Sequence, residues 1–205
     1  EPPFLALVVS GGHSHIIAVK DYTDFEILGR TRDDAAGEAL DKAARAMGLD
    51  YPGGKNLDIR AKNGNPDAYI FPHPRVDGAP LDFSFSGLKT AVLQLIQREE
   101  KKGEPVIKED VAYAFQETAL QLMVGKTLHA VEKLQPKMVI TAGGVAANSR
   151  LRVMLAEGMK KYPDIELSQP PIKYCTDNAA MIGATGYIAY KHGLFGDFTS
   201  TADSS

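Results

Sequence analysis

The sequence has 205 residues, of which 44% are hydrophobic and 24% charged, as in an ordinary globular protein with one sizeable core or two small ones. Its formal net charge of −3 excludes a global basic field, so contact with nucleic acid would need a local basic patch. The single cysteine, Cys175, excludes an internal disulfide framework. No apolar run reaches the roughly 18 residues of a membrane-spanning helix, and no signal peptide is evident, so we expect a cytoplasmic protein with no membrane contact.

Two runs rich in Val, Ile and Leu lie on either side of Gly11-Gly12, between Leu5 and Val19. This pattern predicts two antiparallel strands joined by a tight turn. We expect the two glycines to adopt positive φ and to leave backbone N–H groups open to an anion, with the Ser10 hydroxyl beside them. A plain hairpin turn explains the stretch equally well when it is considered alone.

A strand, two helices and an irregular segment are predicted next. The alternation over Asp24–Thr31 indicates a third strand. A helix is expected from Ala35 to about Met47, capped by Asp33-Asp34, and a shorter one over Asn56–Ala61. Residues 63–80 are rich in Pro, Gly and Asn, which predicts a surface excursion without regular structure.

Apolar and polar residues alternate before the middle helices, which predicts a strand with one polar face over Leu81–Ser86. Helices are expected over about Leu88–Arg98 and about Lys108–Leu134. The second is long enough to be the central packing helix, and Gly125 within it suggests a close helix crossing.

The C-terminal part alternates between strands and helices. Lys137–Val145 predicts a short buried strand that runs into a glycine pair, followed by a helix over about Ser149–Lys161. A strand over Asp164–Ser168 and a last helix over about Ala179–Lys191 complete the pattern. The Ser-, Thr- and Asp-rich residues 197–205 are expected to be a disordered tail.

This order of elements predicts an α/β fold, a ribonuclease-H-like lobe in which a mixed sheet carries helices on both faces. Four glycine-bearing or capped turns fall at strand ends or helix starts, namely Val8–Gly12, Gly53-Gly54, Gly143-Gly144 and Thr176–Asn178. Turns of this kind on one rim of a sheet would form a nucleotide-sized site with backbone donors for a phosphate.

Several familiar motifs are absent from the sequence. There is no G-x-G-x-x-G, no P-loop motif, and the five histidines form neither H-x-x-x-H nor H-E-x-x-H. Asp177 suits either a helix cap or a metal ligand. On local grounds the cap is favoured, because one carboxylate cannot hold a metal.

Six stretches, in this order, resemble the signatures of the TsaD family, the tRNA N6-adenosine threonylcarbamoyltransferases, in its bacterial form. They are Val9–His13, Asp33–Lys42, Leu49–Gly54, Leu81–Thr90, Ala142–Asn148 and Cys175–Ile182. The resemblance implies a lobe of the actin-like ATPase and sugar kinase superfamily. It also implies transfer of a threonylcarbamoyl group from threonylcarbamoyl-adenylate to N6 of adenosine 37, in tRNAs that read codons beginning with A.

The resemblance further implies roles for individual residues. The implied substrate-binding residues are Val8, Val9, Ser10, Gly11, Gly12, Asp41, Gly54, Asp58 and Asn148. Val8–Gly12 would cradle the adenylate, Asp41 and Gly54 would contact its sugar end with Asp58 as a further ribose contact, and Asn148 would border the adenosine pocket. Asp177 would be the carboxylate ligand of one iron or zinc ion.

The family's first lobe, which carries an H-x-x-x-H pair as the two other metal ligands, has no counterpart in this sequence. We therefore interpret residues 1–196 as the second, C-terminal nucleotide-binding lobe of a longer enzyme and expect it to be inactive alone. The implied partners of the parent enzyme are tRNA and proteins of the TsaB and TsaE types. The alternative is an ATPase or kinase-like lobe that binds nucleotide without transferase chemistry.

Overall fold

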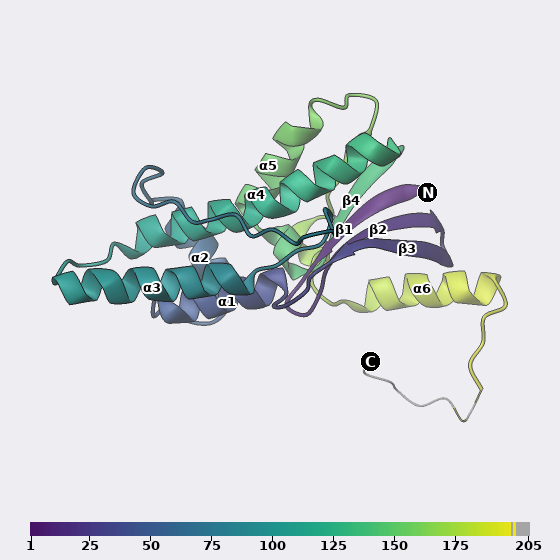
Figure 1. Ribbon diagram of the computed structural model, residues 1–205. Coiled ribbons are helices and arrows are strands. Elements are labelled where there is room, and N and C mark those ends of the chain that lie inside the picture. The colour runs from purple at the N-terminus through teal and green to yellow at the C-terminus, as the bar shows by residue number, and fades with distance from the viewer. Residues whose placement is uncertain (198, 200–205) are drawn as a thin grey trace.

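A computed structural model, which describes residues 1–197 and 199, contains a five-stranded mixed sheet in the order β3-β2-β1-β4-β5 (Figure 1). The strands are β1 (Phe4–Val9), β2 (Ser14–Asp21), β3 (Asp24–Arg30), β4 (Met138–Ala142) and β5 (Glu166–Ser168). β1 pairs with β2, and β2 with β3, in antiparallel fashion, whereas β4 is parallel to both β1 and β5. The predicted hairpin, third strand and mixed sheet are thus confirmed.

The helices of the described chain are α1 (Ala36–Ala46), α2 (Gly53–Ala61), α3 (Ser86–Lys102), α4 (Lys108–Leu134), α5 (Ser149–Met159) and α6 (Ala179–Lys191), with 3-10 turns η1 (Gly144–Ala147) and η2 (Ile172–Tyr174). The long helix α4 contacts α1, α2, α3 and α5, which confirms its central position. Figure 1 shows α4 and α5 on one side of the strands and α6 on the other. Within the described residues, no helix combines the length and apolar character needed to cross a membrane.

The hydrophobic core covers one face of the sheet. Leu5, Leu7 and Val9 of β1 are buried on this face, where Leu7 lies opposite Ile16 and Leu5 lies beside Val139. Burial of each large aliphatic side chain contributes about 1.5–3 kcal/mol to stability. α6 has no buried residue, so helices α1 to α5 supply the helical side of this core. Most of the predicted tail, 198 and 200–205, lies outside the described residues.

The strand predicted over residues 81–86 is wrong, because only a single bridge, between Thr31 and Phe83, forms there. Phe83 is fully buried, as the alternation predicted. Asp82 is buried as well, and its carboxylate accepts the backbone N–H of Arg30 at 2.9 Å. The Asp82 side chain therefore accepts the Arg30 N–H at the end of β3, in place of the carbonyl oxygen that a neighbouring strand would have supplied.

Helix α1 is capped from the hairpin, and the predicted cap at Asp33-Asp34 is wrong. The buried Ser14 hydroxyl accepts the N–H of Ala36 at 2.8 Å. The N–H of Gly37 donates to the carbonyl oxygen of Ser10 at 3.0 Å. These two bonds satisfy N–H groups of the first helical turn and hold α1 against the turn that follows β1.

Asp33 caps helix α3 instead. Its carboxylate accepts the N–H of Phe85 at 2.8 Å and the hydroxyls of Ser84 and Ser86 at 2.6 and 2.8 Å. Burial raises the pKa of Asp33, but the hydrogen bonds from Ser84, Phe85 and Ser86 outweigh it and hold the pKa below its ordinary value. Local patterns did not reveal this cap because Phe85 lies 52 positions away in the sequence.

Residues 63–80 contain no helix or strand, as predicted, but they are anchored to the core. Phe71 is buried and packs edge-on against Phe115, with ring centroids 6.5 Å apart. The N–H of Asn65 donates to the carboxylate of Asp110 at 2.8 Å. The segment is therefore fastened to α4 at two points, which a purely superficial loop would not be.

The close helix approach predicted at Gly125 is wrong and occurs at a different glycine. A Cβ added at Gly125 would meet nothing within 4 Å, whereas one at Gly158 of α5 would lie 2.6 Å from Cδ1 of Leu128. The crossing of α4 and α5 therefore depends on Gly158.

We expect Gly143→Ala to destabilise the fold by about 2 kcal/mol or more, because it introduces backbone strain and overlap. Gly143 has φ +93°, and an added Cβ would lie 2.2 Å from the carbonyl oxygen of Val9. The matched control is Gly125→Ala, which should stabilise α4 by about 1 kcal/mol through helix propensity. Urea unfolding measures both changes, and equal effects of the two substitutions would show that Gly143 is not strained by a side chain.

Candidate functional site

The turn between β1 and β2 contains four residues, Ser10–His13. The N–H of Ser10 donates to the carbonyl oxygen of His13 at 2.8 Å. The Ser10 Oγ accepts the N–H groups of Gly12 at 3.3 Å and His13 at 3.0 Å. Neither Gly11 nor Gly12 has positive φ, so the positive φ predicted for these glycines is wrong, although the hairpin itself forms. A four-residue loop closed by a serine hydroxyl does not require the left-handed conformation.

This turn still presents donors to an anion. The N–H of Gly11 has no acceptor within the described part of the chain, and the Ser10 hydroxyl keeps its own proton to donate. An added Cβ at Gly11 or Gly12 would meet nothing within 4 Å, so the space beside them is open. The side chain of Val9 is fully buried, so Val9 can contact a ligand only through its backbone.

The turn after β4 lies directly against this one. An added Cβ at Gly143 would be 2.2 Å from the carbonyl oxygen of Val9 and 3.2 Å from Cβ of Ser10. Because β1 and β4 are parallel and paired up to Val8 and Ala142, their carboxyl ends share one rim of the sheet. The predicted meeting of the two glycine-bearing turns is confirmed.

A cavity of about 510 Å³ opens beside the Ser10–His13 turn, between it and the junction of α1 and α2. Its lining consists of Gly11, Glu38, Asp41, Lys42, Arg45, Leu49, Asp50, Tyr51 and Gly53. Two predicted substrate-binding residues, Gly11 and Asp41, therefore border one space. This volume lies within the range of small-ligand sites.

Asp41 and Gly54 are joined by a hydrogen bond, since Oδ1 of Asp41 accepts the N–H of Gly54 at 2.8 Å. Gly53 and Gly54 form the first turn of α2, and the helix thus begins earlier than the predicted Asn56. An added Cβ at Gly53 would lie 2.8 Å from Cβ of Ala44, so the close packing of α1 on α2 requires glycine there. The second carboxylate oxygen of Asp41 accepts no hydrogen bond from described residues and is available to a ligand hydroxyl.

Two basic residues of this cavity were not predicted. Nζ of Lys42 lies 2.8 Å from Asp34 and 2.7 Å from Glu38, and hydrogen bonds to Asp34 first and Glu38 second raise its pKa. Arg45 is exposed and forms no ion pair with any described residue. The sequence did contain a signal for Arg45, because residues four positions apart on a helix share a face, and Arg45 follows Asp41 by four positions on α1.

Asp58 and Asn148 meet at the start of α5. Asp58 accepts the hydroxyl of Ser149 at 2.9 Å and its N–H at 3.2 Å. The side chain of Asn148 is buried, caps α5 by accepting the N–H of Leu151 at 2.9 Å and donates to Gln116 at 2.9 Å. The structure brings these two predicted residues together, but neither lines the cavity beside Gly11.

Asp177 lies on the turn before α6, with its side chain exposed and without a hydrogen bond or ion pair to the described residues. Asn178 caps α6 by accepting the N–H of Met181 at 3.1 Å, so the favoured role of Asp177 as the cap is wrong. An added Cβ at Gly144 would lie 3.9 Å from Cγ2 of Thr176. The Asp177 segment therefore begins beside the shared rim.

The described residues do not form a metal site by themselves. Nowhere in 1–197 and 199 do three or more His, Cys, Asp or Glu residues gather in a metal-binding arrangement. Cys175, two positions before Asp177, is buried, with its Sγ near the carbonyl oxygens of Pro170 and Pro171. A solitary exposed carboxylate does not hold iron or zinc.

Comparison with known proteins identifies similar sequences. A sequence model of the TsaD family, described as tRNA N6-adenosine threonylcarbamoyltransferase, matches residues 1–184. Proteins of that name from Clostridium botulinum (strain Hall) and Thermosipho africanus are 50% and 46% identical over 193 and 202 residues. These alignments cover 94% and 98% of this chain but 56% and 60% of the relatives. The chain thus spans less than two thirds of the relatives' length.

Solved structures resemble the fold at low sequence identity. Full-length HypF in its phosphate- and nucleotide-bound form matches with a TM-score of 0.68 and 12% identity, over 94% of this chain and 33% of HypF. An activator of 2-hydroxyisocaproyl-CoA dehydratase from Clostridium difficile, with bound ADPNP, has a TM-score of 0.51 and 15% identity, over 96% of this chain and 65% of its own. These likenesses concern the fold alone and confirm the predicted fold class.

We expect Asn148→Ala to lower the free energy of unfolding by about 2 kcal/mol, since it removes a helix cap and leaves the buried Gln116 without its donor. Asn178→Ala is the matched control. It removes the same kind of cap from the exposed helix α6 and should cost about 0.5–1 kcal/mol. Chemical denaturation compares the two, and a larger loss for Asn178→Ala would contradict this account of α5.

Proposed function

Because the chain belongs to the TsaD family, the tRNA N6-adenosine threonylcarbamoyltransferases, we propose that it is the second, adenylate-binding lobe of such an enzyme. The reaction transfers the threonylcarbamoyl group of threonylcarbamoyl-adenylate to N6 of adenosine 37, in tRNAs that read codons beginning with A. The N6 nitrogen forms a bond to the carbamoyl carbon and loses a proton. The bond from that carbon to the phosphate oxygen breaks, and adenosine monophosphate leaves.

The observation that carries this proposal is the meeting of Gly11 and Asp41 at one cavity, with Gly54 bonded to Asp41. The N–H of Gly11, which has no acceptor among the described residues, and the Ser10 hydroxyl offer two donors to the adenylate phosphate. The exposed Arg45, which forms no ion pair among the described residues, adds a positive charge to the same lining. Donors fixed in advance in this way stabilise charge on the phosphate without reorganisation when the carbon–oxygen bond breaks.

Asp41 is suited to the ribose end of the adenylate. One of its carboxylate oxygens is fixed by the N–H of Gly54, and the other is left to accept a ribose hydroxyl. Asp58 and Asn148 support this arrangement differently from the ribose and adenosine contacts first expected of them. Their side chains hold the start of α5, and we propose that they act by positioning the rim.

A first lobe, outside this sequence, would complete the site. The shorter span of the chain relative to its relatives supports this inference. Asp177 would supply one ligand of an iron or zinc ion, and two histidines of the first lobe would supply others. A bound metal would polarise the carbamoyl carbonyl. In the cytoplasm, the complete enzyme would work with tRNA and with partners of the TsaB and TsaE types.

We expect Gly11→Val, in the complete enzyme, to reduce transfer of the labelled threonylcarbamoyl group to tRNA at least about tenfold. Its side chain would enter the open space beside the cavity, where an added Cβ meets nothing within 4 Å, so the fold should be retained. A loss of about 1.4 kcal/mol in binding corresponds to a tenfold effect.

Gly183→Val is the control for this substitution, since Gly183 lies on α6 and an added Cβ there is equally unobstructed. Full transfer by Gly11→Val with an unchanged unfolding temperature would remove this turn from the site. Turnover of ATP without any transfer to tRNA, by the unmodified enzyme, would favour the alternative of an ATPase or kinase-like lobe.

Metal analysis provides an independent test of Asp177. We expect this chain alone, treated with chelator and then incubated with iron or zinc, to retain no stoichiometric metal, because the described residues bring no three possible ligands together. In the two-lobe enzyme, Asp177→Ala should abolish bound metal. One tightly held ion per isolated chain, by elemental analysis, would show that the ligands have been misassigned.

A further inference from the structure

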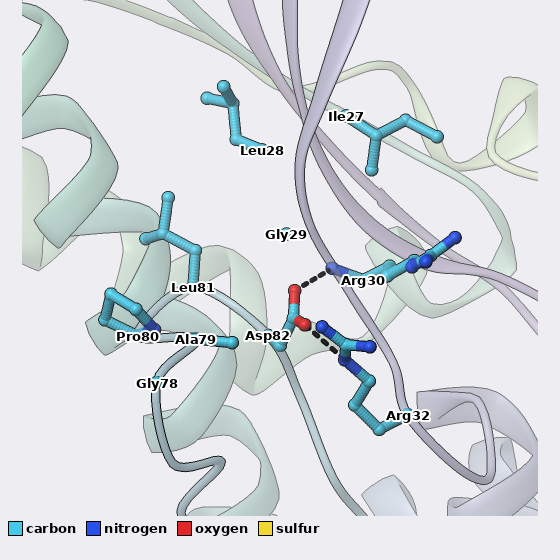
Figure 2. Close-up of a pocket in the computed structure, with 10 residues that line it drawn as sticks. All are labelled: Ile27, Leu28, Gly29, Arg30, Arg32, Gly78, Ala79, Pro80, Leu81 and Asp82. Atoms are coloured by element: carbon cyan, nitrogen blue, oxygen red, sulfur yellow. Dashed lines mark hydrogen bonds and ion pairs between the residues drawn. The ribbon is translucent and has the colours of Figure 1, made fainter.

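A second cavity, of about 580 Å³, lies at the end of β3, away from the lining of the candidate site. Residues 27–30, Arg32 and 78–82 form its walls. Figure 2 shows the carboxylate of Asp82 between the backbone N–H of Arg30 and the side chain of Arg32, with the Arg30 side chain extending away from Asp82. Two arginines therefore line one polar cavity.

The charge of this cavity is not balanced by its own carboxylates. Asp82 pairs with Nε of Arg32, and it is the only acidic residue among the lining residues. The guanidinium of Arg30 forms no ion pair with any residue in the described ranges, and it is exposed. Asp82 is buried, so it orients Arg32 while the outer nitrogens of that guanidinium remain available.

Further basic groups surround these arginines. His15 pairs with Arg30 across β2 and β3, and its ring centroid lies 5.5 Å from that of His13. Burial, then His13 and Arg30, lower the pKa of His15, which favours its neutral form, so this imidazole offers a hydrogen-bonding group and no fixed charge. Nζ of Lys126 donates to the carbonyl oxygen of Pro80 in the cavity wall at 2.8 Å. The positive charge at this end of β3 therefore comes from Arg30, Arg32 and Lys126, with Asp82 as the one carboxylate of the cavity lining, on a chain whose formal net charge is −3.

The position of this patch relative to the candidate site follows from the sheet. β1 and β3 are both antiparallel to β2, so they end at the same edge of the sheet. Arg30 lies opposite His15, the second residue after the Ser10–His13 turn. The end of β3 therefore lies at the same edge of the sheet as the Ser10–His13 turn, with only β2 between β3 and β1.

We propose that Arg30 and Arg32 bind backbone phosphates of tRNA at the end of β3, beside the threonylcarbamoyl-adenylate site. This inference rests on the proposed function. Guanidinium groups match phosphate oxygens through paired N–H donors, and such contacts position a nucleic acid without reading its sequence. The patch supplies the local basic surface that an acidic chain needs for contact with RNA.

Arg30 provides the cleaner test, because Arg32→Gln would leave the buried carboxylate of Asp82 without its charged partner. Unmodified tRNA transcript is titrated against the chain over a series of salt concentrations. Arg30→Gln should weaken tRNA binding several-fold and reduce the slope of log K against log salt by about 1. Arg30→Lys keeps the charge and should retain most of that slope. Lys101→Gln, at the far end of α3, is the charge-matched control and should change neither quantity.

Three outcomes would overturn the proposal. These are unchanged tRNA binding by Arg30→Gln, an equal loss in Lys101→Gln, and no measurable binding of tRNA by the unsubstituted chain at low salt. A loss of affinity for inorganic phosphate without any loss for tRNA would likewise assign the cavity to a free anion. Gly11→Val could reduce transfer in the complete enzyme while Arg30→Gln leaves the tRNA affinity unchanged. In that case the proposed function stands and this inference alone fails.

Discussion

The close contact of three backbone segments at one rim of the sheet is the constraint on which the candidate site depends. An added Cβ at Gly37 would lie 2.7 Å from the carbonyl oxygen of Ser10, and one at Gly143 only 2.2 Å from that of Val9. The turn after β1 is therefore held between the start of α1 and the turn after β4. Because that position is fixed, Gly11 faces the cavity together with Asp41. Gly143 needs the conformational freedom of glycine because its φ is positive. At Gly11, the absence of a side chain instead leaves the space beside the backbone open to a ligand.

Periodicity and turn chemistry predicted most of the elements, since strands such as β1 and helices such as α4 follow from local patterns of burial. Two errors share one cause, because Asp33 and Asp82 bond to backbone groups about 50 positions away. Such contacts appear only once the fold has brought segments together. At the site, sequence motifs indicated Gly11 and Asp41, but they did not indicate Arg45, whose relevance depends on the cavity that it lines.

The site divides into parts with different physical roles. Gly11, Asp41 and Arg45 border open space and retain unused hydrogen-bonding or charge capacity. Asp58 and Asn148, by contrast, accept hydrogen bonds from residues at the start of α5. Asp177 is exposed and forms no hydrogen bond or ion pair with the part of the chain that the structure describes. A chain that spans 56–60% of its relatives' length is consistent with a site of which one wall is supplied from elsewhere.

The central claim is that the turn after β1 and the start of α2 together hold an adenylate. Amide NMR of this chain, titrated with threonylcarbamoyl-adenylate, tests that claim most directly. The account predicts that the N–H signals of Gly11 and Gly54 shift together with one affinity, while those of Gly125 and Gly158, on helices α4 and α5, stay in place. Shifts confined to other parts of the chain, or none at saturating ligand, would contradict it.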